Sequence, residues 1–269
     1  MRRRSASKGA GRGLLAAAAL GALSLSGTAV CAQDKKPMLP GTFSGNVALT
    51  TEYLYRGISQ TDDAPALQGG LNYEVKLAAP VSVYAGVWGS NVDFSATESA
   101  SATPTDGASV ELDWVGGLRG AIGSTGLSWD IGFIYYTYPG ADSDFNYDFW
   151  EAQGAIGYDF GPAAMTASLN YSPDFFGASG RAWYPKLAVK APIPGVEGLS
   201  LAGYVAEQFV EKKTVYGIDK NYLEWNLSLT YNVAGWFDAS VTYWDTNLSP
   251  GDADDGKAEA VLFTISRSF

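Results

Sequence analysis

Four carboxylates are the residues of this sequence best suited to acid–base chemistry. They are Glu111, Asp113, Glu151 and Glu224. Two carboxyl groups suffice to hydrolyse a glycosidic bond, but no spacing in the chain selects two of the four. The sequence has no histidine, which excludes Ser-His-Asp and Cys-His catalysis and the two-His-one-carboxylate iron site. We therefore expect no enzyme, no metal site and no cofactor.

Arg119 and Asp130 are placed to meet across a tight turn. If residues 123–126 form a hairpin, Arg119 lies opposite Asp130, and Leu118 lies opposite Ile131 on the other face of the sheet. Opposite charges that face each other on neighbouring strands stabilise a sheet. The pattern therefore predicts a structural ion pair.

Glu52 and Arg56 share one face of a predicted strand. Four residues of extended chain separate them by about 13 Å, so we do not expect a direct pair. Arg56 stands just before the sequence Gly-Ile-Ser-Gln, which is typical of a turn. Two interpretations stay open: Arg56 is a charged residue at a constriction, or it anchors a loop.

The elements that must position these residues show the two-residue period of β-strands. In the clearest one, apolar residues or glycine at odd positions from Leu67 to Leu77 alternate with polar residues or glycine at even positions. Twelve such segments follow one another: 42–56, 67–77, 81–92, 109–122, 127–138, 147–158, 164–174, 182–190, 199–209, 221–231, 236–246 and 258–269. A tilted membrane strand needs about 9–11 residues, and no run after Asp34 reaches the roughly 18 apolar residues of a spanning helix.

The connections between these segments are alternately short and long. The longer ones are residues 57–65, 93–108, 139–146, 175–181, 210–220 and 247–257. Bacterial outer-membrane barrels have an even number of strands, short periplasmic turns and longer extracellular loops. We therefore predict an all-β fold, namely a closed antiparallel transmembrane β-barrel of about 12 strands. Two segments fit the strand pattern least well: 147–158, where Phe149 falls on the inward face, and 182–190, which contains Pro185.

The first residues have the order of a secretory signal peptide. A basic stretch over residues 2–12 precedes an apolar run over residues 14–25, and small residues lead to Ala32. We expect cleavage after Ala32, with Ala29 as the alternative. Residues 1–32 would then be removed.

Residues 33–41 would form a short periplasmic segment and residues 42–269 the barrel. A second interpretation makes Cys31 the lipidated first residue of a lipoprotein. It is less favoured, because Thr28 and Val30 do not fit the motif around such a cysteine.

The inward parity selects the residues expected to line the lumen. The candidates are Glu52, Arg56, Glu74, Trp88, Glu111, Asp113, Arg119, Asp130, Glu151, Lys186, Glu224 and Asp238. With Lys76 and Lys190, the inner face carries eight acids against five bases. This excess predicts a weak preference for cations. Six aromatic residues of the same parity could narrow or plug the bore: Tyr84, Trp88, Tyr136, Tyr204, Trp236 and Trp244.

The expected partners follow from charge and from the end of the chain. The net charge is −10, which argues against nucleic acid as a partner. The chain ends on Phe269 after an amphipathic segment, and this resembles the assembly signal of bacterial outer-membrane barrels. We expect outer-membrane lipids, the barrel assembly machinery and small hydrophilic solutes as partners.

Several short segments resemble the TorF family of porin-like outer-membrane proteins. They are GNVALTTEYLYRGISQ (45–60), QGGLNY (68–73), GVWGSNVD (86–93), YYTYPG (135–140) and NYDFWE (146–151). The sequence Tyr-Arg-Gly-Ile-Ser-Gln is the most specific of these. The resemblance covers about residues 45–158 and implies outer-membrane location and barrel architecture, without a substrate.

Two functional hypotheses from different classes remain. The first is a passive pore for small hydrophilic solutes or ions. The second is a non-conducting barrel with a structural or interaction role. Barrels of about 8 strands are filled by side chains and those of about 16 leave an aqueous channel, so a barrel of intermediate size fits either hypothesis.

Overall fold

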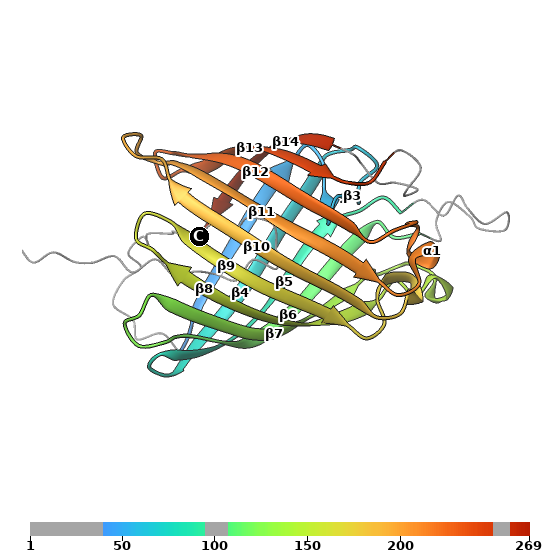
Figure 1. Ribbon diagram of the computed structural model, residues 1–269, viewed down its shortest axis with the longest axis horizontal. Helices are drawn as coiled ribbons and strands as arrows, with labels where there is room; N and C mark the ends of the chain where they lie inside the picture. Colours follow the sequence, from blue (N-terminus) through green and yellow to red (C-terminus); the bar gives the residue numbers. More distant parts are fainter. Residues whose placement is uncertain (1–39, 95–106, 250–258) are drawn as a thin grey trace, which may run out of the picture.

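The chain forms a closed antiparallel β-barrel in a computed structural model that describes residues 40–94, 107–249 and 259–269 (Figure 1). The wall consists of β1 (Thr42–Thr50), β4 (Ala66–Ala78), β5 (Val81–Asn91), β6 (Val110–Ala121), β7 (Leu127–Thr137), β8 (Phe149–Asp159), β9 (Ala164–Ser172), β10 (Ala182–Pro192), β11 (Leu199–Val210), β12 (Tyr222–Val233), β13 (Phe237–Thr246) and β14 (Glu259–Ser268). Each strand pairs with the next, and β1 closes the ring against β14. The predicted fold class is confirmed.

The remaining elements are short. They are β2 (Leu54–Tyr55), β3 (Ile58–Ser59), η1 (Ser143–Phe145), η2 (Phe176–Ala178) and α1 (Lys213–Tyr216). Within the described ranges, no helix has the length and apolar character needed to cross a membrane.

The alternation of side chains explains the closed sheet. Outward-facing residues are large and apolar, as Leu67, Ile131 and Phe263 illustrate, and more than half of each of these side chains is exposed. Inward-facing residues are polar, small or aromatic. Closure pairs the backbone N–H and C=O groups of every strand with a neighbour, which is the condition for crossing a lipid bilayer with strands.

The two weakest predicted segments are both strands of the wall. Phe149 faces inward, is buried, and stacks on Tyr136 with a centroid distance of 4.3 Å. Pro185 lies within β10, and the pairing of β10 with β11 passes from Trp183–Phe209 directly to Lys186–Ala206. Proline has no N–H to donate, so the ladder is interrupted there without changing the number of strands.

The predicted first segment, 42–56, is wrong in its last third. β1 ends at Thr50, and the chain leaves the wall to form the separate hairpin of β2 and β3, with Leu54 paired to Ser59 and Tyr55 to Ile58. Arg56 and Gly57 form its two-residue turn with φ angles of 51° and 79°. A hairpin keeps the same two-residue alternation as a strand, so the period did not reveal the turn. Glu52 and Arg56 therefore do not belong to a wall strand.

The two ends of the barrel differ in their connections. Short turns join β4 to β5, β6 to β7, β8 to β9, β10 to β11 and β12 to β13 at one end, here called the short-turn end. The opposite, long-loop end carries β2, β3, η1, η2 and α1, and Figure 1 shows β3 and α1 there. The predicted alternation of short and long connections is confirmed, although much of the loops 93–108 and 247–257 lies outside the described residues.

Candidate functional site

The hairpin at residues 54–59, here called the inserted hairpin, reaches across the lumen at the long-loop end. The guanidinium of its tip residue, Arg56, donates from Nη2 to Glu151 Oε2 at 2.6 Å and from Nη1 to Gln208 Oε1 at 2.7 Å. Glu151 lies on β8 and Gln208 on β11, and both strands are nearly opposite β1 in the ring. The hairpin therefore bridges the two sides of the barrel.

Aromatic rings complete the surroundings of Arg56. The guanidinium carbon lies 4.0 Å from the ring centroid of Tyr184, 4.8 Å from that of Tyr55 and 5.4 Å from that of Phe175. Contacts of this kind between a cation and a ring are favourable, the more so where water is excluded. Only 6% of Arg56 is exposed. The ion pair with Glu151 is thus a buried one.

The backbone of the inserted hairpin is held as well. The Tyr222 hydroxyl donates to the Arg56 carbonyl at 2.7 Å, and a Cβ built on Gly57 would overlap the Thr246 methyl group. Arg56 is a non-glycine residue in the left-handed region, a conformation that costs about 1–3 kcal/mol and persists only where the surroundings impose it. Contacts with β12 and β13 therefore hold the turn in place.

Glu151 accepts further hydrogen bonds beside the one from Arg56. Asn170 Nδ2 donates to its Oε2 at 2.9 Å and the Tyr136 hydroxyl at 3.3 Å. Removing one partner of a buried ion pair is costly, because the remaining charge stays buried without compensation. The Arg56–Glu151 pair thus ties the inserted hairpin to the wall.

Two more carboxylates, Glu111 and Asp113, lie next to the inserted hairpin. The Tyr53 hydroxyl donates to Glu111 Oε1 at 3.1 Å. Burial and the charges of Glu111 and Asp113 raise the pKa of Tyr53 well above its usual value, which keeps the phenol a neutral donor. Among the described residues, Glu111 Oε2 and Asp113 Oδ1 have no hydrogen-bond partner. Trp88 packs edge-on against Tyr53, with a centroid distance of 5.5 Å.

Glu224 on β12 and Lys186 on β10 are two further charged residues of the wall strands at this end. Glu224 accepts hydrogen bonds from the Tyr184 hydroxyl and, at 2.9 Å, from Trp244 Nε1. Lys186 Nζ lies 5.4 Å from the ring centroid of Tyr204. Acidic side chains outnumber basic ones among the buried or half-buried residues of this end: Glu52, Glu111, Asp113, Glu151 and Glu224 against Arg56 and Lys186.

Packed aromatic and aliphatic side chains fill the same end of the barrel. Tyr136, Phe149, Phe175 and Tyr222 belong to one buried cluster, and Tyr55 of the inserted hairpin packs against it. The expectation that inward aromatic residues plug the bore therefore fits Trp88 and Tyr136.

Trp236 does not fit that expectation. It is 76% exposed and lies in the short turn before β13, outside the wall strands. Its parity therefore did not determine which way it points.

The half of the lumen near the short turns is less filled. Small inward-facing residues there, such as Thr166, Ser200 and Thr230, are partly exposed. Asp238 accepts a hydrogen bond from Asn232 Nδ2 at 2.6 Å. Water can therefore reach the lumen from this end.

Arg119 and Asp130 stand opposite each other as predicted, and so do Leu118 and Ile131. The predicted ion pair is wrong, however, because Arg119 pairs with Glu74 on β4. Asp130 instead accepts a hydrogen bond from the Tyr84 hydroxyl at 2.7 Å.

Two paired glycines allow Tyr84 to reach Asp130. Gly117 on β6 faces Gly132 on β7, and a Cβ on either would lie 2.6 Å from the Tyr84 hydroxyl oxygen. Tyr84 on β5 therefore crosses over two neighbouring strands. The sequence could suggest close packing at the glycines, but it could not identify the ring that uses the space.

Residues that the sequence analysis did not select complete the Arg56 pocket. They are Asn170, Phe175, Tyr184, Gln208 and Tyr222. No pattern in the sequence points to these five residues. The glycine after Arg56 indicates only a turn, and it is this turn that brings Arg56 to them.

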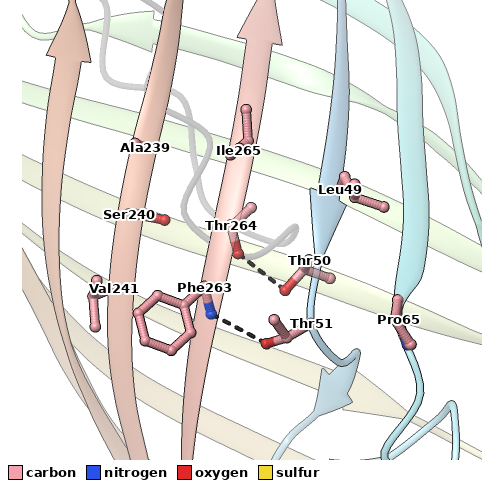
Figure 2. A pocket seen from close by; sticks show the side chains of 10 residues that line it. All are labelled: Leu49, Thr50, Thr51, Pro65, Ala239, Ser240, Val241, Phe263, Thr264 and Ile265. Carbon is pink, nitrogen blue, oxygen red and sulfur yellow. Dashed lines mark hydrogen bonds between the residues drawn. The ribbon is translucent and has the colours of Figure 1, made fainter.

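The seam between β1 and β14 carries an apolar surface groove. The pairing ends at Thr50–Thr264, and beyond it Phe263 N donates to Thr51 Oγ1 at 3.1 Å (Figure 2). The groove measures about 480 Å³, and outward residues such as Leu49, Phe263 and Ile265 line it. It belongs to the apolar outer surface of the barrel.

At the short-turn end of this seam, Phe269 exchanges two backbone hydrogen bonds with Gly45, and Phe269 is 71% exposed.

Metal chemistry has no ready site in the parts of the chain that the structure describes. Residues 40–94, 107–249 and 259–269 contain no group of three or more acidic or cysteine side chains arranged to hold a metal ion.

Solved structures similar to this chain share its barrel fold. A chain from a study of the in-meso crystallization of membrane proteins aligns with a TM-score of 0.50 at 8% identity, over 84% of this chain and 83% of that chain. The KdgM porin in complex with disordered oligogalacturonate aligns with a TM-score of 0.49 at 6% identity, over 84% and 98%. An outer membrane channel from Pseudomonas putida F1 aligns with a TM-score of 0.46 at 11% identity, over 90% and 100%. At identities this low, the similarity shows a shared fold and does not indicate which solute this chain would pass.

Sequence comparison places most of the chain in a known family. A family model described as a bacterial protein of unknown function, Gcw_chp, covers residues 34–269. No curated protein matches the chain. The match does not confirm the name TorF, which stays a resemblance of short segments.

Proposed function

Since the chain belongs to the Gcw_chp family of bacterial proteins of unknown function, we propose its function from the barrel itself: a porin-like channel of the Gram-negative outer membrane. It would pass small hydrophilic solutes or ions by diffusion, with a weak preference for cations, and perform no catalysis. The long loops would face the outside of the cell. The predicted signal peptide, residues 1–32, lies outside the described residues and supports export on sequence grounds alone.

The observation that carries this proposal is the inner face of the barrel. Polar side chains line it, and small ones such as Ser200 and Thr230 are partly exposed in the half near the short turns. The inserted hairpin occupies the other half without being part of the wall. A lumen that is polar near the short turns and is filled at the other end by a segment outside the wall suits a channel better than a purely structural barrel.

The charges of the lumen support the preference for cations. The pore-lining candidates with Lys76 and Lys190 give eight acids against five bases, or −3. Five of these eight acids lie buried at the long-loop end. Carboxylates at a constriction attract cations and repel anions.

A second function, a non-conducting barrel with a structural or interaction role, has one observation in its favour. The inserted hairpin and the aromatic cluster fill the long-loop end. If they never move, the barrel would not conduct.

Conductance in planar bilayers separates the two functions. Because Thr50 and Ala66 are paired in register, a short Gly-Ser turn can replace residues 53–63 without opening the wall. We expect rare openings for the unaltered protein and sustained conductance for this variant, with a reversal potential under a KCl gradient that indicates cation preference. A variant with a Gly-Ser turn at residues 194–197, at the opposite end, should behave like the unaltered protein.

Three other results would count against the proposal. A silent hairpin-replacement variant that is folded would favour the structural function. Clear anion preference would refute the selectivity. Equal gains for both replacements would show that the hairpin is not the barrier.

A further inference from the structure

The pocket that holds the tip of the inserted hairpin has the chemistry of a guanidinium-binding site. Glu151, 1% exposed, supplies a carboxylate, Gln208, fully buried, supplies an amide oxygen, and Tyr184 supplies an aromatic face at 4.0 Å. A planar guanidinium uses these three partners together: it donates hydrogen bonds in its plane and stacks on a ring above it. All three partners belong to the barrel wall, on β8, β11 and β10.

The group that occupies this pocket does not belong to the wall. Arg56 is the tip of a hairpin whose two strands have only two residues each. A two-stranded hairpin is marginally stable by itself even when it is longer, and Arg56 adopts an unfavourable left-handed conformation. Contacts within the hairpin therefore do not suffice to hold it. The pocket holds the hairpin, and a competing cation could displace it.

The charge around the pocket would attract such a competitor. With Arg56 in place, its guanidinium compensates the charge of Glu151. Without Arg56, the buried carboxylate of Glu151 would lose its cationic partner. Buried charges without compensation are unfavourable, so the empty pocket would favour a cation from solution. Inward-facing residues near the short turns, such as Ser200 and Thr230, are partly exposed, so we expect a cation to enter the lumen from that end.

We propose that the Glu151–Gln208–Tyr184 pocket is a binding site for small guanidinium-type organic cations and that the Arg56 side chain is its tethered occupant. In the intact protein the hairpin competes with solute cations for this site. The binding itself is independent of conduction; only the idea that such cations are transported solutes rests on the proposed channel.

Binding of methylguanidinium chloride to the purified full-length protein in detergent tests the site. We expect saturable binding to Arg56→Ala by calorimetry, and binding at least about tenfold weaker to the intact protein, because its site is occupied. Glu151→Gln in the Arg56→Ala background should abolish the gain, because it removes the carboxylate. Urea, which has a similar shape without the charge, and sodium chloride at equal ionic strength should not bind.

Arg119→Ala provides the matched control. Its partner Glu74 is also a lumenal carboxylate, but the side chains of this pair are about one-fifth exposed. We expect no saturable binding to this variant. Equal binding to Arg119→Ala and Arg56→Ala would show a general attraction to an acidic lumen and would overturn the proposal.

If Arg56→Ala does not fold by itself, refolding of this variant in the presence of methylguanidinium tests the site instead. In that case methylguanidinium, but neither urea nor sodium chloride, should restore the folded, heat-modifiable band of the variant on a gel. No rescue and no binding would refute the site. Binding by a protein that stays silent in bilayers would support the site while refuting the channel; conductance without binding would do the reverse.

Discussion

Gly57 stands beside Arg56 at the point where the inserted hairpin meets Thr246 on β13. Its φ of 79° favours glycine, and a Cβ would overlap the methyl group of Thr246. Around these two residues, small changes in side-chain volume or charge decide whether the hairpin stays in its pocket. Two predictions follow from that arrangement.

Gly57→Ala should displace the inserted hairpin and increase conductance in planar bilayers. The added methyl group cannot fit against Thr246, and overpacking of this kind costs about 1–3 kcal/mol. Thr246→Ser removes the obstructing methyl group while its hydroxyl can still accept from Leu248 N. The double variant should therefore recover part of the closed behaviour. A Gly57→Ala protein with the conductance of the unaltered one would show that the turn is not tightly held.

Glu151→Gln should make Arg56 accessible to trypsin. The substitution leaves a buried arginine without its counter-charge, at a cost of about 3–5 kcal/mol, so the hairpin is expected to leave the pocket. Mass spectrometry after brief digestion of folded protein should detect cleavage after Arg56 in the variant and little in the unaltered protein.

Glu211→Gln is the control for that digestion. It removes the partner of Arg181 in an exposed pair, whose side chains are 65% and 46% exposed; solvent screens such pairs, so they contribute little to stability. Cleavage after Arg56 should not change. Equal protection of Glu151→Gln and the unaltered protein would mean that other contacts hold the hairpin.

Strands β5, β6 and β7 form a unit in which one aromatic side chain crosses its neighbours. Tyr84 lies over the Gly117–Gly132 pair and reaches Asp130. Because Gly117 and Gly132 have no side chain, the Tyr84 side chain can extend from β5 across β6 to Asp130 on β7. The contact therefore depends on the packing of all three strands and is not a property of any one of them.

Gly132→Ala should destabilise the barrel by about 1–3 kcal/mol, because its Cβ would lie 2.6 Å from the Tyr84 hydroxyl oxygen and 2.8 Å from the Gly116 carbonyl oxygen. The urea concentration at the midpoint of unfolding, followed by tryptophan fluorescence in detergent, measures the loss. Gly154→Ala, also on a wall strand but with nothing within 4 Å of its Cβ, should leave the midpoint nearly unchanged. Equal effects would point to strand propensity instead of the Tyr84 contact.

The whole molecule has two different ends, and the proposed function assigns each to one side of the membrane. Asp142 is exposed at the long-loop end and Ser124 at the short-turn end. The sequence has one cysteine, Cys31, which falls in the predicted signal peptide. Single cysteines introduced at either end would therefore report the orientation.

Asp142→Cys in intact cells should react with a membrane-impermeant maleimide, whereas Ser124→Cys should react only after the outer membrane is permeabilised. The physical reason is the proposed orientation, with long loops outside and short turns in the periplasm. Equal labelling of both positions in intact cells would contradict the topology, and the reverse pattern would invert it.

The strand wall could be predicted from the sequence, because it depends on a local rule. In a strand that faces lipid on one side, every second residue must be apolar, and this period survives in each segment whatever the others do. A tight turn then determines the register of its two strands, which is why Arg119 was correctly placed opposite Asp130. Even the segments with Phe149 and Pro185 kept enough of the period to be recognised.

Only the tertiary structure decided what fills the lumen. Arg56 meets Glu151 and Gln208 because ring closure makes β8 and β11, five and four positions from β1 in the ring, face the lumen opposite the hairpin, and no local period records that proximity. The same alternation describes a strand that continues along the wall and a hairpin that turns into the bore, which is why residues 51–56 were wrongly predicted as part of a wall strand. Arg119 on β6 pairs with Glu74 on β4, while Asp130 accepts a hydrogen bond from Tyr84. These contacts join strands that are not neighbours, so the register of a single hairpin does not determine them.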